Sequence, residues 1–249
     1  MKYTVFSAML LGPRTKQEDC IFDGIDLYQA DFLTQKKIID TDFLLLGVCD
    51  GMGGHDHGEA ASRFVCSQIK ETFDRTMFSA EKIKACLTEI QDLTAEHLSA
   101  NCGTTVAGLM IMDDQTIVFN AGDSRVYKIS TSKMDYISHD HSLVQGLVDK
   151  SFIQQDSATF HPLKNVIDFG IGPIFNDVWK NFNIYFFEES IAKEAWYLLC
   201  SDGVNDLMNE KEMHELLMPS PIDNGDILLK ALQKKGLKDN ASFIIVEIQ

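Results

Sequence analysis

Three apolar stretches of the chain end in an aspartate beside a glycine, and this repeated ending limits the folds that the sequence can adopt. The stretches and their endings are Phe43–Cys49 before Asp50-Gly51, Thr116–Ala121 before Gly122-Asp123, and Trp196–Cys200 before Ser201-Asp202-Gly203. Strands that are apolar on both faces belong in the interior of a layered structure. We therefore expect acidic side chains to emerge from several buried strands and to meet at one edge of the sheets.

Two further acidic positions extend this pattern. Glu18-Asp19 follows the first predicted strand, and Asp239 precedes the last one. Carboxylates that lie within a few ångströms of one another raise each other's pKa, and a divalent cation removes that conflict. Because every available ligand atom is an oxygen, Mg²⁺ or Mn²⁺ is expected rather than Zn²⁺. An Asp-Gly pair after one strand can simply mark a turn, but the repetition favours a metal site.

The periodicity of apolar residues predicts a mixed fold in one domain, residues 1–249. Short apolar runs predict strands at Tyr3–Met9, Phe43–Cys49, Thr105–Met112, Thr116–Asn120, Val126–Ile129, Trp196–Cys200 and Phe243–Ile248. The helical period predicts helices at Glu59–Thr76, Ala80–Ser99, Ser142–Lys150, Glu210–Met218 and Asp226–Lys235. Strands and helices do not alternate strictly, which favours an α+β fold of antiparallel sheets covered by helices.

Charge and composition narrow the classes of partner and compartment. The formal net charge is −15 over 249 residues, and such a chain repels nucleic-acid phosphates unless it has a basic patch. The longest apolar stretch is far shorter than the roughly 20 residues that cross a bilayer, and the first residues do not resemble a signal peptide. We expect a cytoplasmic protein that binds neither nucleic acid nor membrane. Its six cysteines include no C-x-x-C pair, which favours reduced thiols.

Seven short motifs occur in an order that resembles a known family. They are Arg14-Thr15-Lys16-Gln17-Glu18-Asp19, Asp50-Gly51-Met52-Gly53-Gly54-His55, Cys102-Gly103-Thr104-Thr105, Ala121-Gly122-Asp123-Ser124-Arg125, Asp140-His141-Ser142, Ser201-Asp202-Gly203 and Asp239-Asn240. The set resembles the metal-dependent protein phosphatases (PPM, type 2C serine/threonine phosphatases) in their single-domain bacterial form. The resemblance implies a four-layer α-β-β-α sandwich, in which helices flank two antiparallel sheets.

The resemblance also implies which residues hold the metal ions. Asp50 would bridge two Mn²⁺ or Mg²⁺ ions, and Gly51 would offer its backbone carbonyl. Asp202 and Asp239 would complete the shell of the first ion, and Glu18 would serve the second. Asp123, together with Asp202, would hold a third and weaker ion.

The implied reaction hydrolyses phosphoserine or phosphothreonine in proteins, which makes the substrates the products of a serine/threonine kinase. A water that bridges the two metal ions would attack phosphorus directly, with Asp19 orienting it and Arg14 holding the phosphate. His55 is the candidate general acid for the leaving oxygen, because imidazole titrates in the right range. A solvated loop histidine is the alternative reading of His55.

Two departures from the family pattern leave the substrate open. Asp168-Phe169-Gly170-Ile171-Gly172 stands where many relatives carry Arg-Ala-Leu-Gly, and an aromatic segment follows at Pro173–Ser190. Two other functions are therefore kept beside the first. One is a catalytically silent member that binds phosphoproteins or another partner, and the other is a two-metal hydrolase of small phosphoesters or nucleotides.

Overall fold

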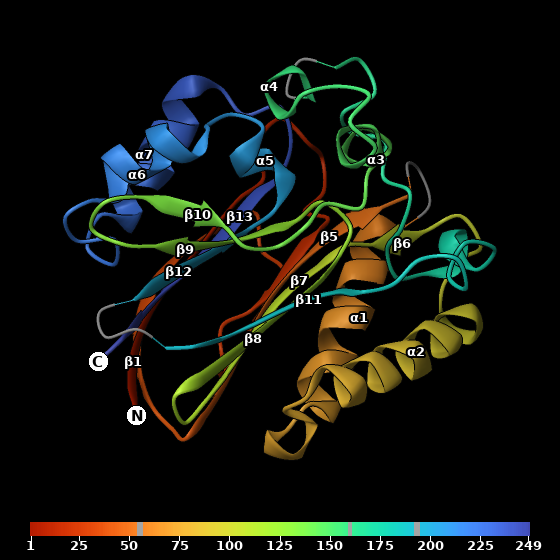
Figure 1. The fold of residues 1–249 in the computed structure, drawn as a ribbon, viewed down its shortest axis with the longest axis horizontal. Coiled ribbons are helices and arrows are strands. Elements are labelled where there is room, and N and C mark those ends of the chain that lie inside the picture. The colour runs from red at the N-terminus through yellow and green to blue at the C-terminus, as the bar shows by residue number, and fades with distance from the viewer. Residues whose placement is uncertain (54–56, 159–160, 192–194) are drawn as a thin grey trace.

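Two antiparallel sheets form the centre of the protein (Figure 1). The computed structural model describes residues 1–53, 57–158, 161–191 and 195–249. Within these ranges the first sheet has the order β10 (Met134–Tyr136), β9 (Arg125–Ile129), β12 (Trp196–Cys200), β13 (Ala241–Ile248), β1 (Lys2–Leu10) and β4 (Phe32–Asp40). The second has the order β11 (Tyr185–Ser190), β8 (Gln115–Ala121), β7 (Val106–Met112), β5 (Phe43–Met52), β2 (Asp19–Phe22) and β3 (Leu27–Tyr28), with β6 (Gly103–Thr104) paired to β5.

Helices cover the outer face of each sheet (Figure 1). The second sheet is covered by α1 (Gly58–Thr72) and α2 (Ala80–His97), and the first by α5 (Asp202–Asn205), α6 (Glu210–Leu217) and α7 (Gly225–Lys235). Two more helices, α3 (Leu143–Asp149) and α4 (Gln155–Ala158), lie in the connection that follows β10. Short 3-10 helices occur at Arg75–Met77 and Pro173–Phe175.

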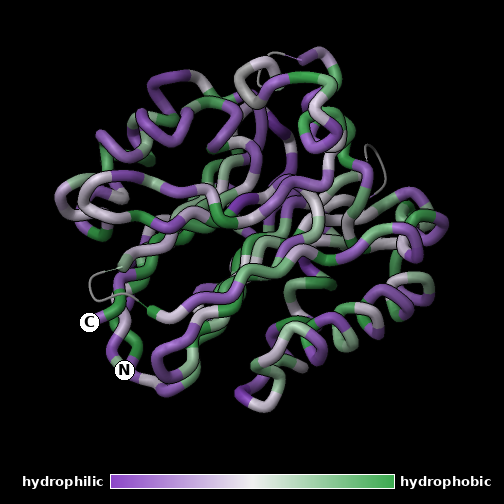
Figure 2. The backbone as a smooth tube through the Cα atoms, in the orientation of Figure 1, coloured by the Kyte–Doolittle hydropathy of each residue, from purple (hydrophilic) through white to green (hydrophobic). Residues whose placement is uncertain are grey.

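Three apolar cores separate these layers. One lies between α1, α2 and the second sheet, one lies between the two sheets, and one lies between the first sheet and α5–α7. Figure 2 shows the hydrophobic residues concentrated along the strands, with hydrophilic residues on the outer helices and connections. A strand that has a core on both sides must be apolar on both faces, as β5 and β12 are. The predicted four-layer α+β sandwich is confirmed.

The structure differs from the sequence predictions mainly in the boundary of one helix and in several short or edge strands that were not predicted. The helix predicted at Glu59–Thr76 ends at Thr72, because the Asp74 side chain accepts the Thr76 N–H at 2.7 Å and starts a separate 3-10 turn. Six of the described strands were not predicted, namely β2, β3, β4, β6, β10 and β11. All six cysteines are free and buried, as predicted. Across the described ranges, none of the helices has the length and hydropathy that a membrane crossing requires.

Candidate active site

Asp19 and Asp50 lie directly opposite each other on neighbouring strands. The antiparallel pairing of β2 with β5 sets Asp19 against Asp50 and Cys20 against Cys49. A directly opposed pair in an antiparallel sheet brings the two side chains within about 5 Å at Cβ. Like charges in that position repel, so this register is stable only where something compensates for the charge.

The backbone of Asp50 is fixed by two threonines. The Asp50 N–H donates to Thr105 Oγ1 at 3.0 Å, and the Asp50 carbonyl accepts from Thr104 Oγ1 and from the Thr105 N–H, both at 2.9 Å. No backbone polar group of Asp50 is left to compete for its own side chain. The carboxylate is therefore held at the end of β5, where the predicted metal site needs it.

The carboxylate of Asp19 is fully buried, and only one of its two oxygens accepts hydrogen bonds from described residues. Its Oδ2 accepts hydrogen bonds from Ser201 Oγ at 2.8 Å and from Ser242 Oγ at 2.6 Å. Its Oδ1 is buried and has no hydrogen-bond partner among the residues that the structure describes. Two hydroxyls that fix one oxygen leave the other aimed in one direction and free to bind a water or a cation.

Asp202 and Asp239 come from the first sheet, so the site spans both sheets. Asp202 begins α5 directly after β12, and Asp239 directly precedes β13. Their connections are in close contact, because a Cβ on Gly203 would lie 1.8 Å from the Asn240 carbonyl oxygen. The Asn240 side chain accepts the Glu18 N–H at 2.8 Å and so ties Glu18 to the same corner.

The pKa values show that these carboxylates act on one another. Burial raises the pKa of Asp19 to about 7, although the Ser242 and Ser201 hydroxyls act in the opposite direction. Burial, followed by repulsion from Asp19 and Asp202, raises the pKa of Asp50 well above its usual value. Burial also raises the pKa of Asp202 to about 6, and the hydrogen bond of its side chain to Asp50 partly offsets this. Two carboxyl groups hydrogen-bond only when one holds a proton, so a cation would replace that proton.

Asp123 faces the same site from the end of β8. Its side chain is buried, with 7% exposure, and within the described ranges its Oδ1 has no hydrogen-bond partner. Burial, with repulsion from Asp202, raises the pKa of Asp123. The neighbouring Ser124 Oγ lies 2.6 Å from Thr105 Oγ1, so the Asp123 turn and the backbone of Asp50 share one threonine.

The two remaining predicted ligands are Glu18 and Gly51. Gly51 is pressed against the start of α1, where a Cβ on it would lie 2.1 Å from the Gly58 carbonyl oxygen. Glu18 is half-buried, and a Cβ on Gly58 would lie 2.8 Å from its Oε1. Burial raises the pKa of Glu18, and the Arg14 guanidinium acts against that rise.

Arg14 stands at the exposed rim of this acidic cluster. Its Nη2 donates to Asp239 Oδ2, and this hydrogen bond raises the pKa of Arg14 further. The guanidinium is half exposed, so it can be reached from solvent. His55, the predicted general acid, lies outside the described residues.

The donor set fits divalent cations, although its geometry is not that of a closed ligand shell. Among the described residues, no three His, Cys, Asp or Glu side chains are already positioned to bind one metal ion. The oxygens of Asp19 and Asp123 that no described residue pairs with, together with the raised pKa values, show a cluster in which a bound cation would stabilise the ionised carboxylates. Oxygen donors suit Mg²⁺ and Mn²⁺.

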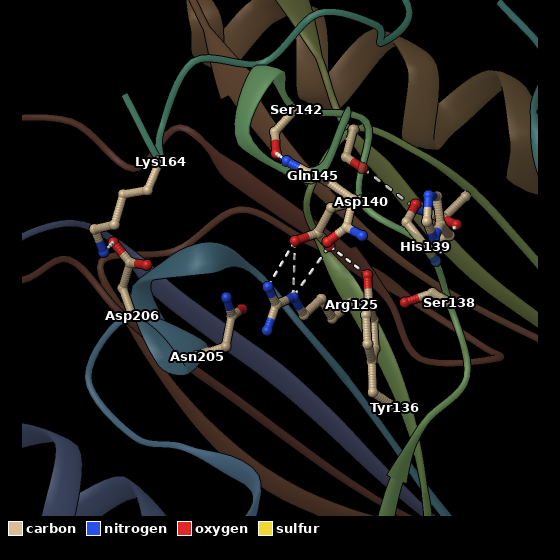
Figure 3. A network of polar contacts seen from close by, with 12 residues as sticks. Arg125, Tyr136, Ser138, His139, Asp140, Ser142, Gln145, Lys164, Asn205 and Asp206 are labelled. Carbon is tan, nitrogen blue, oxygen red and sulfur yellow. Dashed lines mark hydrogen bonds and ion pairs between the residues drawn. The ribbon is translucent and has the colours of Figure 1, made fainter. Parts of the chain in front are cut away.

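A cavity of about 710 Å³ opens beside Asp123 and Asp202. Figure 3 shows its polar wall, where Arg125 donates to both oxygens of Asp140 and Lys164 pairs with Asp206 at 2.6 Å. Arg125 is mostly buried and belongs to this ion pair. Its guanidinium is therefore engaged by Asp140 at the wall of the cavity.

The sequence predicted the acidic residues of the site but not the role of the hydroxyl and amide groups that orient them. These are Thr104, Thr105, Ser201 and Asn240. The signal was present, because each lies within a recognised motif or next to an acidic ligand. The hydroxyl of Ser242 belongs with these groups, because it donates to Asp19 Oδ2 at 2.6 Å.

Comparisons of this chain with known proteins all point to one family. The family model for protein phosphatase 2C matches residues 29–220, which is 192 of the 249 residues. The serine/threonine phosphatase stp of Listeria innocua is 29% identical over 213 residues, covering 80% of this chain and 82% of that protein.

Two crystal structures extend the likeness across nearly the whole chain. The serine/threonine phosphatase Stp1 of Staphylococcus aureus is 27% identical with a TM-score of 0.78, covering 98% of this chain and 94% of that one. The catalytic domain of the phosphatase PstP, in complex with two manganese ions, has the same fold, with a TM-score of 0.77, 21% identity and 99% coverage of each chain. With its fold, its acidic cluster and these matches, the chain belongs to the protein phosphatase 2C family of metal-dependent serine/threonine protein phosphatases.

Proposed function

We propose that residues 1–249 form one catalytic domain that hydrolyses phosphoserine and phosphothreonine in proteins with the help of Mn²⁺ or Mg²⁺. Asp50, Asp202, Asp239 and Glu18, with the carbonyl of Gly51, would hold two ions. Asp123 with Asp202 would hold a third, weaker one. The observation that carries the proposal is the meeting of five aspartates from both sheets, with buried oxygens of Asp19 and Asp123 that no described residue pairs with.

The family match alone does not carry these assignments, because it spans residues 29–220. Arg14, Glu18, Asp19 and Asp239 lie outside that range. Their roles rest on where the fold puts them, opposite Asp50 or beside Asp202. The choice of manganese is supported by the PstP structure, which contains two manganese ions.

When bound, divalent cations at these carboxylates would act as Lewis acids toward the phosphoryl oxygens and would acidify a water molecule. The chain's own residues would do the rest of the positioning. Asp19, held through Oδ2 by Ser201 and Ser242, would use its free Oδ1 to orient the attacking water and to accept its proton.

Arg14 would bind the phosphate oxygens of the substrate. Its guanidinium stays charged at any working pH and its fork matches two oxygens of a phosphate. The hydrogen bond to Asp239 presents the side chain at the rim of the site. A phosphate would compete with Asp239 for this donor. His55 remains the proposed general acid for the serine or threonine oxygen that leaves.

The substrates would be proteins phosphorylated by a serine/threonine kinase, and the site of action would be the cytoplasm. The acidic chain offers no support for nucleic-acid binding, since its formal net charge is −15.

A direct test is hydrolysis of a phosphothreonine peptide by the purified protein with Mn²⁺, then with excess chelator. Turnover that requires Mn²⁺ and stops with chelator is expected. Asp50→Asn should abolish it, whereas Asp42→Asn, a change at an exposed carboxylate, should not. Peptide binding without turnover would instead favour a silent binding protein. Faster turnover of nucleotides than of the peptide would favour a hydrolase of small phosphoesters.

A further inference from the structure

His141 joins three segments that lie far apart in the sequence. Its ring Nδ1 accepts the Gly122 N–H at 3.3 Å, and the backbone N–H of His141 donates to the Gly122 carbonyl at 2.9 Å. Its Nε2 lies 2.9 Å from the Asn183 carbonyl oxygen. Its ring packs on Phe169 with centroids 5.1 Å apart. The His141 side chain therefore links the turn after β8 to residues 169–187. These residues, which overlap the aromatic stretch Pro173–Ser190 named above, are called the aromatic segment 169–187 below.

The hydrogen bonds of His141 define one form of its ring. Nδ1 must lack a hydrogen to accept from the Gly122 N–H, and Nε2 must carry one to donate to the Asn183 carbonyl. The neutral ring with its hydrogen on Nε2 satisfies both. The two ends of the imidazole thus have different tasks, and substitutions can separate them.

The aromatic segment behind His141 is firmly packed. Phe169 stacks on Phe182 and contacts Trp179, with ring centroids 5.5 and 4.9 Å apart. Gln91 of α2 binds both the N–H and the carbonyl of Gly172, at 2.7 and 3.0 Å. This segment is part of the core beneath α2. It can therefore serve as a fixed support for whatever His141 holds.

Gly122, which His141 holds through two hydrogen bonds, directly precedes Asp123. Asp123 is buried, and no group in the part of the chain that the structure describes pairs with its Oδ1, which indicates that this oxygen faces a ligand. Partners that orient a metal ligand from behind commonly affect the affinity of the site by 10- to 100-fold. A change at His141 would move the Asp123 turn without removing a ligand.

We propose that His141 is a positioning residue that anchors the Asp123 turn to the aromatic segment 169–187 and so sets the affinity of the weaker cation position. This inference rests on the proposed function, in which Asp123 is a ligand of that position. It gives the divergent aromatic segment a role as the support of a metal ligand.

The test is a titration with Mn²⁺ in which free Mn²⁺ is followed by electron paramagnetic resonance. His141→Phe keeps the aromatic contact and loses both ring hydrogen bonds, and we expect the weakest class of Mn²⁺ sites to bind about tenfold less tightly. The tighter classes should keep their wild-type affinity. His141→Asn places an oxygen near Nδ1 and should keep more of the affinity.

Three controls separate the possible outcomes. Asp123→Asn removes the ligand itself and should abolish the weak class; if every Mn²⁺ class persisted, the proposed ligand set would be wrong. His139→Asn alters a neighbouring ring that binds Asp149 at 2.9 Å, and it should leave the isotherm unchanged. If Asp123→Asn removes the weak class but His141→Phe leaves it intact, the inference is overturned.

Two further results would also overturn it. An equal loss of affinity in all classes for His141→Phe, with a lowered unfolding temperature, would show a general structural role. An Asn variant as weak as the Phe variant would place the effect away from the Gly122 hydrogen bond.

Discussion

Replacing Asp202 with asparagine should stabilise the metal-free protein at neutral pH. In the folded chain Asp202 lies among other carboxylates, and burial raises its pKa to about 6 from an ordinary value of 3.8. Between these values the folded state binds more protons than the unfolded state, so the free energy of unfolding falls as the pH rises. Asparagine has nearly the same shape and carries no charge.

The size of the effect follows from the pKa of Asp202. It lies about two pH units above its ordinary value, and each unit corresponds to about 1.4 kcal/mol, so ionised Asp202 costs about 3 kcal/mol. This contribution is absent below about pH 4 and complete above about pH 6. A bound divalent cation reverses the sign, because it binds the ionised carboxylate.

The assay is urea unfolding of the wild type and Asp202→Asn at pH 4 and pH 7.5, with chelator and with Mn²⁺. With chelator at pH 7.5 the variant should be more stable by about 3 kcal/mol, and at pH 4 the two should nearly coincide. Mn²⁺ at about 100 times its dissociation constant should stabilise the wild type by about 2.7 kcal/mol and the variant by less. A variant that is less stable than the wild type in chelator at pH 7.5 would refute the reasoning.

Three other predictions concern separate parts of the molecule. Gly203→Ala should lower stability by about 1–3 kcal/mol in thermal unfolding and weaken Mn²⁺ binding, because its Cβ would lie 1.8 Å from the Asn240 carbonyl oxygen. Arg125→Met should lower the free energy of unfolding in urea by about 3–5 kcal/mol, because Asp140 would stay buried without its partner. Adding Asp140→Leu should recover much of this stability. No recovery would contradict the explanation by a buried unpaired charge. Arg14→Ala should raise KM for a phosphopeptide at least tenfold and change stability by less than about 1 kcal/mol; an unchanged KM would exclude Arg14 from phosphate binding.

The strands that the sequence predicted are those with a core on both sides. The strand predicted at Trp196–Cys200 is observed with the same limits, and the one predicted at Phe43–Cys49 becomes β5. Of the strands that were not predicted, β4 and β11 are outermost members of their sheets, whereas β2 lies inside its sheet but has only four residues, too few to show a period. Along β4, exposed positions alternate with less exposed ones. An edge strand that is half in water has no continuous apolar run to detect.

The acidic residues of the site were predictable for a related reason. A single carboxylate after a buried apolar strand can mark a turn, so only its repetition at three strand ends was informative. The hydroxyl and amide groups that orient it, such as Ser201 and Asn240, are common residue types in loops. Their roles depend on contacts across 182 and 222 positions of the chain, which local patterns do not contain.

The position of β13 has a consequence for the newly made chain. This last strand is inserted between β12 and β1, in the interior of the first sheet. Asn240 and Ser242, at the start of this strand, hold Glu18 and Asp19. A nascent polypeptide that has left the ribosome only as far as α7 therefore has neither a continuous first sheet nor an ordered acidic corner. Dephosphorylation could begin only once the final strand has emerged, which would keep unfinished molecules from acting on cellular phosphoproteins.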